Sequence, residues 1–227
     1  MQVVAVQGEP LQAATDLLII GVYADELEKH PLVKAVDKTL AGALTQAISD
    51  EDFHGRADQR LQLMTMGRLR ARRIALLGLG TRKKVSSASL VSIGGHTTRL
   101  GNSVNAKHLV LVLPKDLPRG IDAQGLVARG ASLGAYRFSR YLNDKGRKQT
   151  LTTIALGSTD PKIGLDKRAV QRGLVIAESA AIARDLVNEP PITLFPDSFA
   201  KFAVAEAKKV GISAKVYDEK DLAKMGM

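Results

Sequence analysis

Short apolar runs alternate with longer amphipathic stretches along most of the chain. The runs are rich in Val, Ile and Leu and are bounded by turn-forming residues, which is typical of buried β-strands. On this pattern we predict strands at residues 3–6, 16–23, 61–66, 74–79, 108–113 and 151–156. The run at 108–113 reads HLVLVL and is closed by Pro114, and the last run is closed by Gly157.

The stretches between these runs carry apolar residues at helical spacing. The clearest of them predicts an amphipathic helix of about five turns over residues 32–48. Two further helices are predicted at 86–102 and 122–141, although Gly94 and Gly95 weaken the first of these. Strands that alternate with helices favour an α/β fold, with a mostly parallel sheet in the middle of three layers.

Residues 161–227 follow a different pattern. Turn-forming residues at 158–164 indicate a boundary, so we expect a complete N-terminal α/β domain over 1–160 and a linking helix with the start of a second α/β domain over 161–227. The predicted elements after the boundary are a helix at 166–187, a helix at 196–210, a strand at 214–217 and a short helix at 218–225. A lone strand has nothing to pair with, so we expect the second domain to continue past Met227.

Composition narrows the class of protein. Hydrophobic residues make up 45% and charged residues 25% of the 227 residues, which are ordinary values for a globular chain. The chain has no Cys, which excludes disulfides and thiolate metal sites and fits the cytoplasm. The N-terminus has no signal-peptide pattern, and the apolar run at 17–22 is too short to span a bilayer. We therefore expect a cytoplasmic protein that makes no use of a membrane.

The formal net charge of +10 would attract an anionic partner. Basic residues gather in three places, the third of them interleaved with Tyr136, Phe138 and Tyr141. They are Arg68, Arg70, Arg72 and Arg73, then Arg82, Lys83 and Lys84, and then Arg137, Arg140, Lys145, Arg147 and Lys148. Arginines among aromatic residues favour nucleic-acid contact, whereas the plainer interpretation is a solvated surface. Binding of DNA or RNA therefore stays open as an alternative function.

Two glycine motifs fail in their local context. Residues 130–134 read GASLG and match the GxSxG nucleophile elbow, but an elbow needs a strand directly before the Ser. The residues before this match are helical in pattern, so small residues that permit close contact between a helix and the sheet are the better interpretation. Gly78 and Gly80 follow a strand as a dinucleotide-binding turn would, but Lys83 stands where the third glycine belongs.

Metal-binding patterns are not recognisable either. The chain has four histidines, at positions His30, His54, His96 and His108. Their spacing matches none of the short histidine motifs of zinc sites. Acidic residues at 25–28 and 50–52 are neighbours in sequence that point in different directions on any regular element. They do not supply the clustered carboxylates that a two-metal site needs.

The segment at 183–191 reads ARDLVNEPP and is followed by Pro196 and an amphipathic helix. It resembles the helix end that opens the catalytic domain in the leucyl aminopeptidase (cytosol aminopeptidase) family. The restart differs from the family's LTP-like pattern, because Phe195 intervenes before Pro196. Residues 216–227 (VYDEKDLAKMGM), 134–138 (GAYRF, with Tyr141 and Lys145 after it) and 76–80 (LLGLG) are also similar to segments of that family.

The resemblance implies a macro-domain-like α/β fold with a mixed, mostly parallel sheet for residues 1–160. It also implies that the intact protein removes N-terminal residues, often Leu, from peptides with two divalent metal ions, Mn or Zn. The family's ligand motifs resemble NTDAEGRL and K-G-x-x-[FY]-D-[ST]-G-G, and neither occurs in this sequence. We therefore assign no catalytic, cofactor-binding or metal-binding residue to this chain and expect it to be inactive alone.

The same resemblance implies partners. The intact protein would be a homo-hexamer, and the first partner of this chain would be its own catalytic domain. An ADP-ribose-type ligand is a third alternative, which rests on analogy between folds alone.

Overall fold

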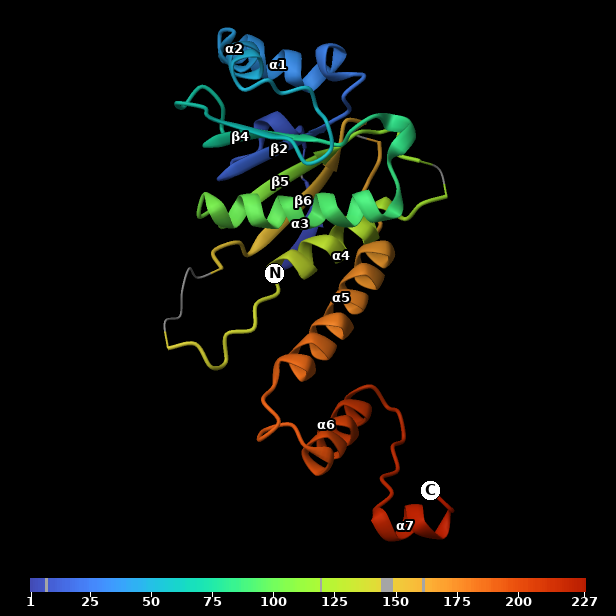
Figure 1. Ribbon diagram of the computed structural model, residues 1–227. Coiled ribbons are helices and arrows are strands. Elements are labelled where there is room, and N and C mark those ends of the chain that lie inside the picture. The colour runs from blue at the N-terminus through green and yellow to red at the C-terminus, as the bar shows by residue number, and fades with distance from the viewer. Residues whose placement is uncertain (7, 119, 144–148, 161) are drawn as a thin grey trace. The chain divides into compact units, whose positions relative to one another are not determined.

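The computed structural model describes residues 1–6, 8–118, 120–143, 149–160 and 162–227. A sheet of six strands has the order β1-β6-β5-β2-β4-β3 (Figure 1). Neighbouring strands are parallel, except that β3 and β4 form an antiparallel pair at one edge. The strands are β1 (Gln2–Ala5), β2 (Leu17–Val22), β3 (Arg60–Met64), β4 (Arg73–Gly78), β5 (His108–Leu113) and β6 (Thr153–Ser158). Each corresponds to a strand predicted from the sequence, and the mostly parallel α/β sheet is confirmed.

Helices cover both faces of this sheet, so the fold has three layers (Figure 1). The flanking helices are α1 (Pro31–Thr39) and α2 (Ala43–Asp50) over one face, and α3 (Ser87–Ser103) and α4 (Ala123–Ala135) over the other. Successive strand residues point to opposite faces. Leu17 and Ile19 therefore join the core beneath α3 and α4, while Leu18 and Ile20 join the core beneath α1 and α2. The uninterrupted apolar run of β2 follows from this burial on both faces.

The prediction of a single helix over 32–48 was wrong, because the segment forms the two helices α1 and α2. The break occurs at Ala41 (φ 54°) and Gly42 (φ 84°), which adopt the left-handed backbone conformation that ends an α-helix. Asp37 holds the corner, because its carboxylate accepts hydrogen bonds from the Thr45 N–H at 2.8 Å and from the Thr45 hydroxyl at 2.7 Å. The apolar spacing continues across the break, which is why the pattern did not reveal it.

The helix predicted at 122–141 is also shorter than expected, since α4 ends at Ala135. Tyr136 has an extended backbone (φ −60°, ψ 131°), and its N–H closes a tight final turn. The rings of Phe138 and Tyr141 pack on each other outside the helix, with centroids 5.8 Å apart. The aromatic residues that extended the apolar pattern thus belong to the following loop.

The chain divides into two compact units, Met1–Ala181 and Ile182–Met227. The first unit continues beyond residue 160 into α5 (Lys167–Asn188), whose buried residues are Ala169, Val170, Gly173 and Ala177. The second unit holds the end of α5, together with α6 (Pro196–Lys209) and α7 (Glu219–Lys224). Among the described residues, none of the helices combines the length and the apolar character needed to cross a membrane.

The strand predicted at 214–217 does not form, because residues 212–218 have no regular secondary structure. A strand is stable only when its backbone groups pair with a neighbouring strand. The second unit offers helices and no such neighbour among its residues, all of which are described. This prediction was wrong because an apolar alternation indicates which side chains can be buried and not whether a partner is present.

The helices α3 and α4 pack backbone against backbone. Gly94 on α3 and Gly130 on α4 each face a carbonyl oxygen of the other helix, and an added Cβ at either position would collide with it. The Thr98 hydroxyl adds a hydrogen bond across the contact, donating to the Ala131 carbonyl at 2.9 Å. Glycine is required here because only its missing side chain permits this distance.

The variant Gly130→Ala is expected to lower the free energy of unfolding by about 3 kcal/mol, since the new Cβ would force α3 and α4 apart. Ser132→Ala in the same helix is the matched control and is expected to change it by about 0.5 kcal/mol or less. Urea denaturation followed by circular dichroism measures both. If the two variants proved equally stable, the close approach at Gly130 would be refuted.

Candidate functional site

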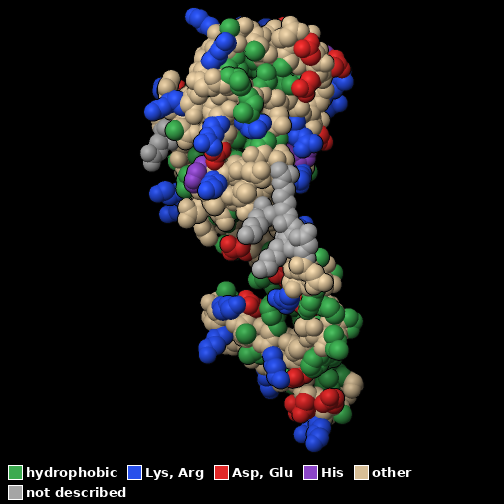
Figure 2. Space-filling model, turned by 90° about the vertical axis from the view of Figure 1, so that its left-hand side faces the viewer, with side chains coloured by type: hydrophobic (Ala, Val, Ile, Leu, Met, Phe, Trp, Pro, Cys, Tyr) green, Lys and Arg blue, Asp and Glu red, His purple; other side chains and the backbone are tan. Residues whose placement is uncertain are grey.

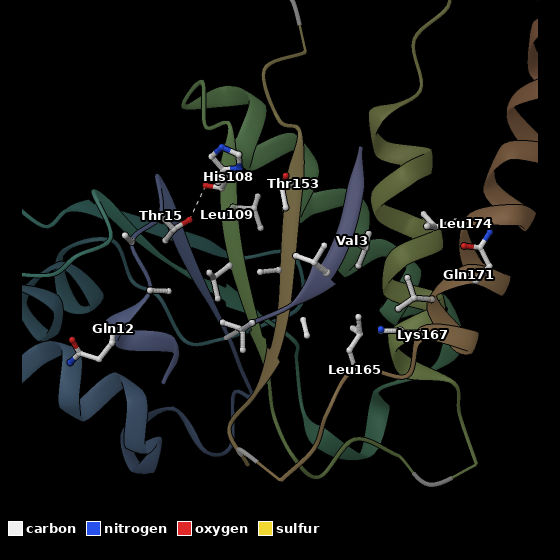
Figure 3. Close-up of a pocket in the computed structure, with 18 residues that line it drawn as sticks. Val3, Gln12, Thr15, His108, Leu109, Thr153, Leu165, Lys167, Gln171 and Leu174 are labelled. Carbon is white, nitrogen blue, oxygen red and sulfur yellow. Dashed lines mark hydrogen bonds between the residues drawn. The ribbon is translucent and has the colours of Figure 1, made fainter. Parts of the chain in front are cut away.

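A groove of about 870 Å³ borders the sheet edge formed by β1 (Figure 3). Residues of β1, β5 and β6 line it together with the first turns of α5 and the segment before β2. Figure 3 shows Lys167, Gln171 and Leu174 on one side of the groove and Gln12 and Thr15 on the other. The groove therefore brings together the two ends of the first unit's chain.

The side chains that line this groove are mostly aliphatic, and its polar groups are already engaged or exposed. The Thr15 hydroxyl donates to the backbone carbonyl of His108 at 2.8 Å, so it holds the chain in place. His108 and Lys167 are exposed residues, and the lining contains no carboxylate. Nucleophilic catalysis needs a nucleophile beside a base, which this lining does not provide. The groove can accommodate an apolar segment but has no recognisable reactive group.

Two histidines of the described part of the chain each lie close to one carboxylate. His54 Nε2 lies 2.7 Å from a carboxylate oxygen of Asp52, and His96 Nε2 lies 3.4 Å from one of Asp58. Across the described ranges, no three His, Asp or Glu side chains gather closely enough to hold a metal ion. A two-metal centre needs several ligands around ions about 3.5–4 Å apart, so the described residues do not fit such a centre.

His30 is buried at the start of α1 and caps that helix. Its Nδ1 accepts a hydrogen bond from the Val33 N–H at 3.4 Å, so this nitrogen carries no proton. Its Nε2 is buried and finds no hydrogen-bond partner among the residues that the structure describes. Burial lowers the pKa of His30 from its ordinary value of 6.5, which keeps the imidazole neutral in the fold. The residue therefore has a structural role that depends on pH.

Replacing the cap, His30→Asn, is expected to make the fold less sensitive to acid. The unfolded chain binds a proton at His30 near a pKa of about 6.5, while the folded chain does so only at lower pH. Wild-type stability therefore falls as the pH drops below about 6.5. Asn still caps a helix but does not titrate, so the free energy of unfolding should fall less steeply between about pH 7 and pH 5.

Urea denaturation at several pH values measures this difference. The pKa of His96 is also lowered, by burial first and by the nearby Arg99 second, but His96 is present in both proteins and its contribution cancels. An identical pH dependence for wild type and variant would show that His30 is not held neutral.

The glycine motifs serve packing. The GxSxG match at 130–134 lies within α4 and not at a strand-to-helix turn, so it does not form a nucleophile elbow. At the end of β4, the Gly80 N–H donates to the Gly55 carbonyl at 3.0 Å, and a Cβ on Gly78 would collide with the Arg56 carbonyl. The backbone of residues 55–56 thus packs directly against Gly78 and Gly80.

Ligands of open α/β sheets bind beyond the carboxyl ends of the strands. At that edge of this sheet, Arg82 interacts with three acidic residues. Its guanidinium forms ion pairs with Asp116 at 3.0 Å and Glu26 at 3.6 Å, and its backbone N–H donates to Asp25 at 3.3 Å. Burial raises the pKa of Tyr23 to about 12, and the charge of Asp116 adds to this. The acidic residues after β2 therefore serve as partners of an arginine.

The helices α4 and α5 begin beside this edge, and each is capped by an aspartate. Asp122 accepts from the Gly125 N–H and Asp166 accepts from the Ala169 N–H, both at 3.0 Å. A helix N-terminus binds phosphate through free N–H groups and its positive dipole end. Carboxylates already occupy both of these positions, so they give no support to the ADP-ribose alternative.

The arginines between β3 and β4 hold loops of the fold itself. Arg68 and Arg70 donate to backbone carbonyl oxygens at 3.2 and 3.4 Å, and Arg72 lies 3.7 Å from Asp16. The members of the third basic cluster that lie outside the described residues are Lys145, Arg147 and Lys148. The nucleic-acid alternative therefore rests on net charge and not on a described site.

The second unit, Ile182–Met227, has no buried side chain, and all of its residues are described. Val187 and Ile192 are 85% and 88% exposed. Figure 2 shows hydrophobic side chains over much of the visible surface of this unit. The other large ones are Ile182, Phe195, Phe199, Val204, Val210, Ile212, Val216, Tyr217, Leu222, Met225 and Met227. Without a core, the unit cannot offset the conformational entropy lost on folding. It therefore needs another protein surface against which its apolar side chains can be buried.

Hydrogen exchange is expected to separate the two units in the isolated chain. Backbone amides of α6 and α7 should exchange at least about a hundredfold faster than those of β2 and β5, because few apolar contacts oppose their opening. Exchange followed by mass spectrometry at peptide resolution measures the two sets in one sample. Comparable protection of α6 and β5 would mean that the second unit is stable by itself.

Sequence comparisons identify relatives of the chain. A family model described as "Cytosol aminopeptidase family, N-terminal domain" matches residues 19–145. A "Probable cytosol aminopeptidase" of Alkaliphilus oremlandii is 29% identical over 233 residues, which cover 100% of this chain and 46% of that protein. Another, from Geobacter sp., is 28% identical over 221 residues, which cover 96% of this chain and 44% of that protein. The chain thus spans about half the length of the curated relatives that it matches.

Solved structures lead to the same class. A mutant of tomato leucine aminopeptidase superposes with a TM-score of 0.89 at 25% identity, over 100% of this chain and 46% of that one. The bottromycin maturation enzyme BotP in complex with Mn gives 0.69 at 26% identity, over 94% and 40%. These likenesses define the α/β N-terminal region of an aminopeptidase. Since the family model covers more than half of its residues, the chain belongs to the cytosol aminopeptidase family.

The family match also confirms the resemblance first seen at residues 183–191. The match at 19–145 lies entirely upstream of that segment, so the two observations are independent.

Proposed function

We propose that this chain is the N-terminal, non-catalytic part of a two-metal aminopeptidase that removes N-terminal residues, often Leu, from peptides. Membership of the cytosol aminopeptidase family supports the reaction class. The observation that carries the proposal is the second unit, which has helices and an exposed apolar surface but no buried side chain. Such a unit is expected of a domain whose larger part is contributed by other residues.

The partner of this exposed surface is the C-terminal half that the relatives have and this chain does not cover. Phe199 in the first turn of α6 and Phe195 at the N-cap of that helix are each 49% exposed. Burying one large apolar side chain stabilises a protein by about 1.5–3 kcal/mol. Docking of the C-terminal half would supply the core that the second unit lacks.

Two divalent metal ions, Mn or Zn, belong to that C-terminal half in this proposal, because the described residues of the present chain form no ligand cluster. Paired metals polarise the scissile carbonyl and lower the pKa of an attacking water. Support for metal dependence comes from BotP, which was solved in complex with Mn. The intact protein is further proposed to act as a homo-hexamer in the cytoplasm.

The isolated 227-residue chain is expected to show no turnover of leucine p-nitroanilide with added Mn²⁺ or Zn²⁺, because its described residues form no cluster that could hold these metal ions. The same chain followed by the C-terminal half of its natural gene should hydrolyse this substrate when supplied with either metal. Absorbance at constant protein concentration measures both. Turnover by the isolated chain that persists through purification would refute the proposal.

A further inference from the structure

A pocket of about 310 Å³ lies where the beginnings of α3 and α4 meet the first half of α5. All of its lining residues belong to the first unit. The helices α4 and α5 touch through Gly125 and Gly173, since a Cβ on Gly173 would collide with the Gly125 carbonyl oxygen. Larger side chains beside this contact line the pocket, which is open to solvent on one side.

Two arginines line the pocket, one from each helix. Arg129 follows Gly125 by four residues, so both lie on the α5-facing side of α4, and Arg172 directly precedes Gly173. The Arg172 guanidinium donates to the Asp122 carboxylate at 2.9 Å. The Nε of Arg129 is buried and has no hydrogen-bond partner within the described part of the chain. An unsatisfied buried donor costs stability, so the guanidinium of Arg129 is not fully paired within the fold.

The charges of the pocket do not balance. Arginine stays protonated in proteins, so Arg129 and Arg172 bring two positive charges against the one negative charge of Asp122. One charge therefore remains for a ligand. A carboxylate is the monoanion whose planar shape matches a guanidinium, whereas a doubly charged phosphate exceeds the charge available.

The other large side chains of the lining are aliphatic, namely Ile121, Leu126 and Ile176. A volume of about 310 Å³ is at the lower end of the range of about 300–1,000 Å³ found for small-molecule pockets. The pocket thus combines one available guanidinium with a short apolar wall. We propose that it binds a small aliphatic carboxylate, with the carboxylate on Arg129 and the hydrocarbon against Ile121, Leu126 and Ile176. This inference does not depend on the proposed peptidase function.

The probe is 4-methylpentanoate, titrated into the 227-residue chain at constant ionic strength and followed by amide NMR shifts. Saturable binding is expected with a Kd of about 1 mM, which is reasonable for so small a ligand. Arg129→Gln should weaken it by about tenfold or more, because the charged hydrogen bond is lost. Arg168→Gln is the matched control, since it removes the same charge from an exposed position one turn earlier than Arg172, and should leave the Kd unchanged.

Two further arms make the result decisive. Neutral 4-methylpentanol and inorganic phosphate are both expected to bind at least about tenfold more weakly than the carboxylate. Arg129→Lys keeps the charge without the guanidinium, so it should also weaken binding, and it replaces Arg129→Gln if that variant does not fold. The proposal is overturned if binding does not saturate, if Arg168→Gln weakens it as much as the Arg129 variants, if Arg129→Lys binds like wild type, or if phosphate or the alcohol binds equally well.

Discussion

The contact of three helices through glycine is the constraint on which the first unit depends. Gly94 and Gly130 bring α3 and α4 together, and Gly125 and Gly173 bring α4 and α5 together. Glycine within a helix costs about 1 kcal/mol of helix propensity, so these positions weaken each helix taken alone. The close approach of the helices offsets this cost, because it lets them cover one face of the sheet. The strand β2 of that sheet is buried on both faces.

Much of this fold was predictable because buried strands appear in the sequence as short runs of apolar residues. The apolar runs located all six strands. The runs of β2, β4 and β5 are continuous because both faces of these strands are buried. The break at Ala41 and Gly42 was not predictable from the apolar pattern. Val36 and Leu40 before the break and Leu44 after it are all buried, so the helical spacing continues through it. The strand expected at 214–217 failed for the opposite reason: its pattern is correct, but pairing depends on a neighbour that the pattern does not contain.

The site was predictable in part. Sequence motifs led to the family, and the helical surroundings of residues 130–134 correctly favoured packing over a nucleophile. The predicted partner was wrong, because Gly130 and Gly134 pack against α3 and not against the sheet. Small residues at helical spacing permit either contact, so the sequence did not distinguish them. The pocket around Arg129 gave no signal, because Arg129 and Arg172 meet only through the crossing of α4 and α5. Gly125 precedes Arg129 by four residues, which puts both on one side of a helix. This spacing is too common in helices to identify a binding site.

The pairing of β1 with β6 has a consequence for how the protein is made. Gln2 lies opposite Thr153, so β1 is paired only after the last strand of the sheet has been synthesised. At about 5–20 residues per second, the ribosome needs on the order of ten seconds to deliver that partner. During this interval the apolar segment at residues 3–6 has no native neighbour and is open to pairing with other chains. The order of the strands thus makes β1 the strand of this sheet that waits longest for its partner.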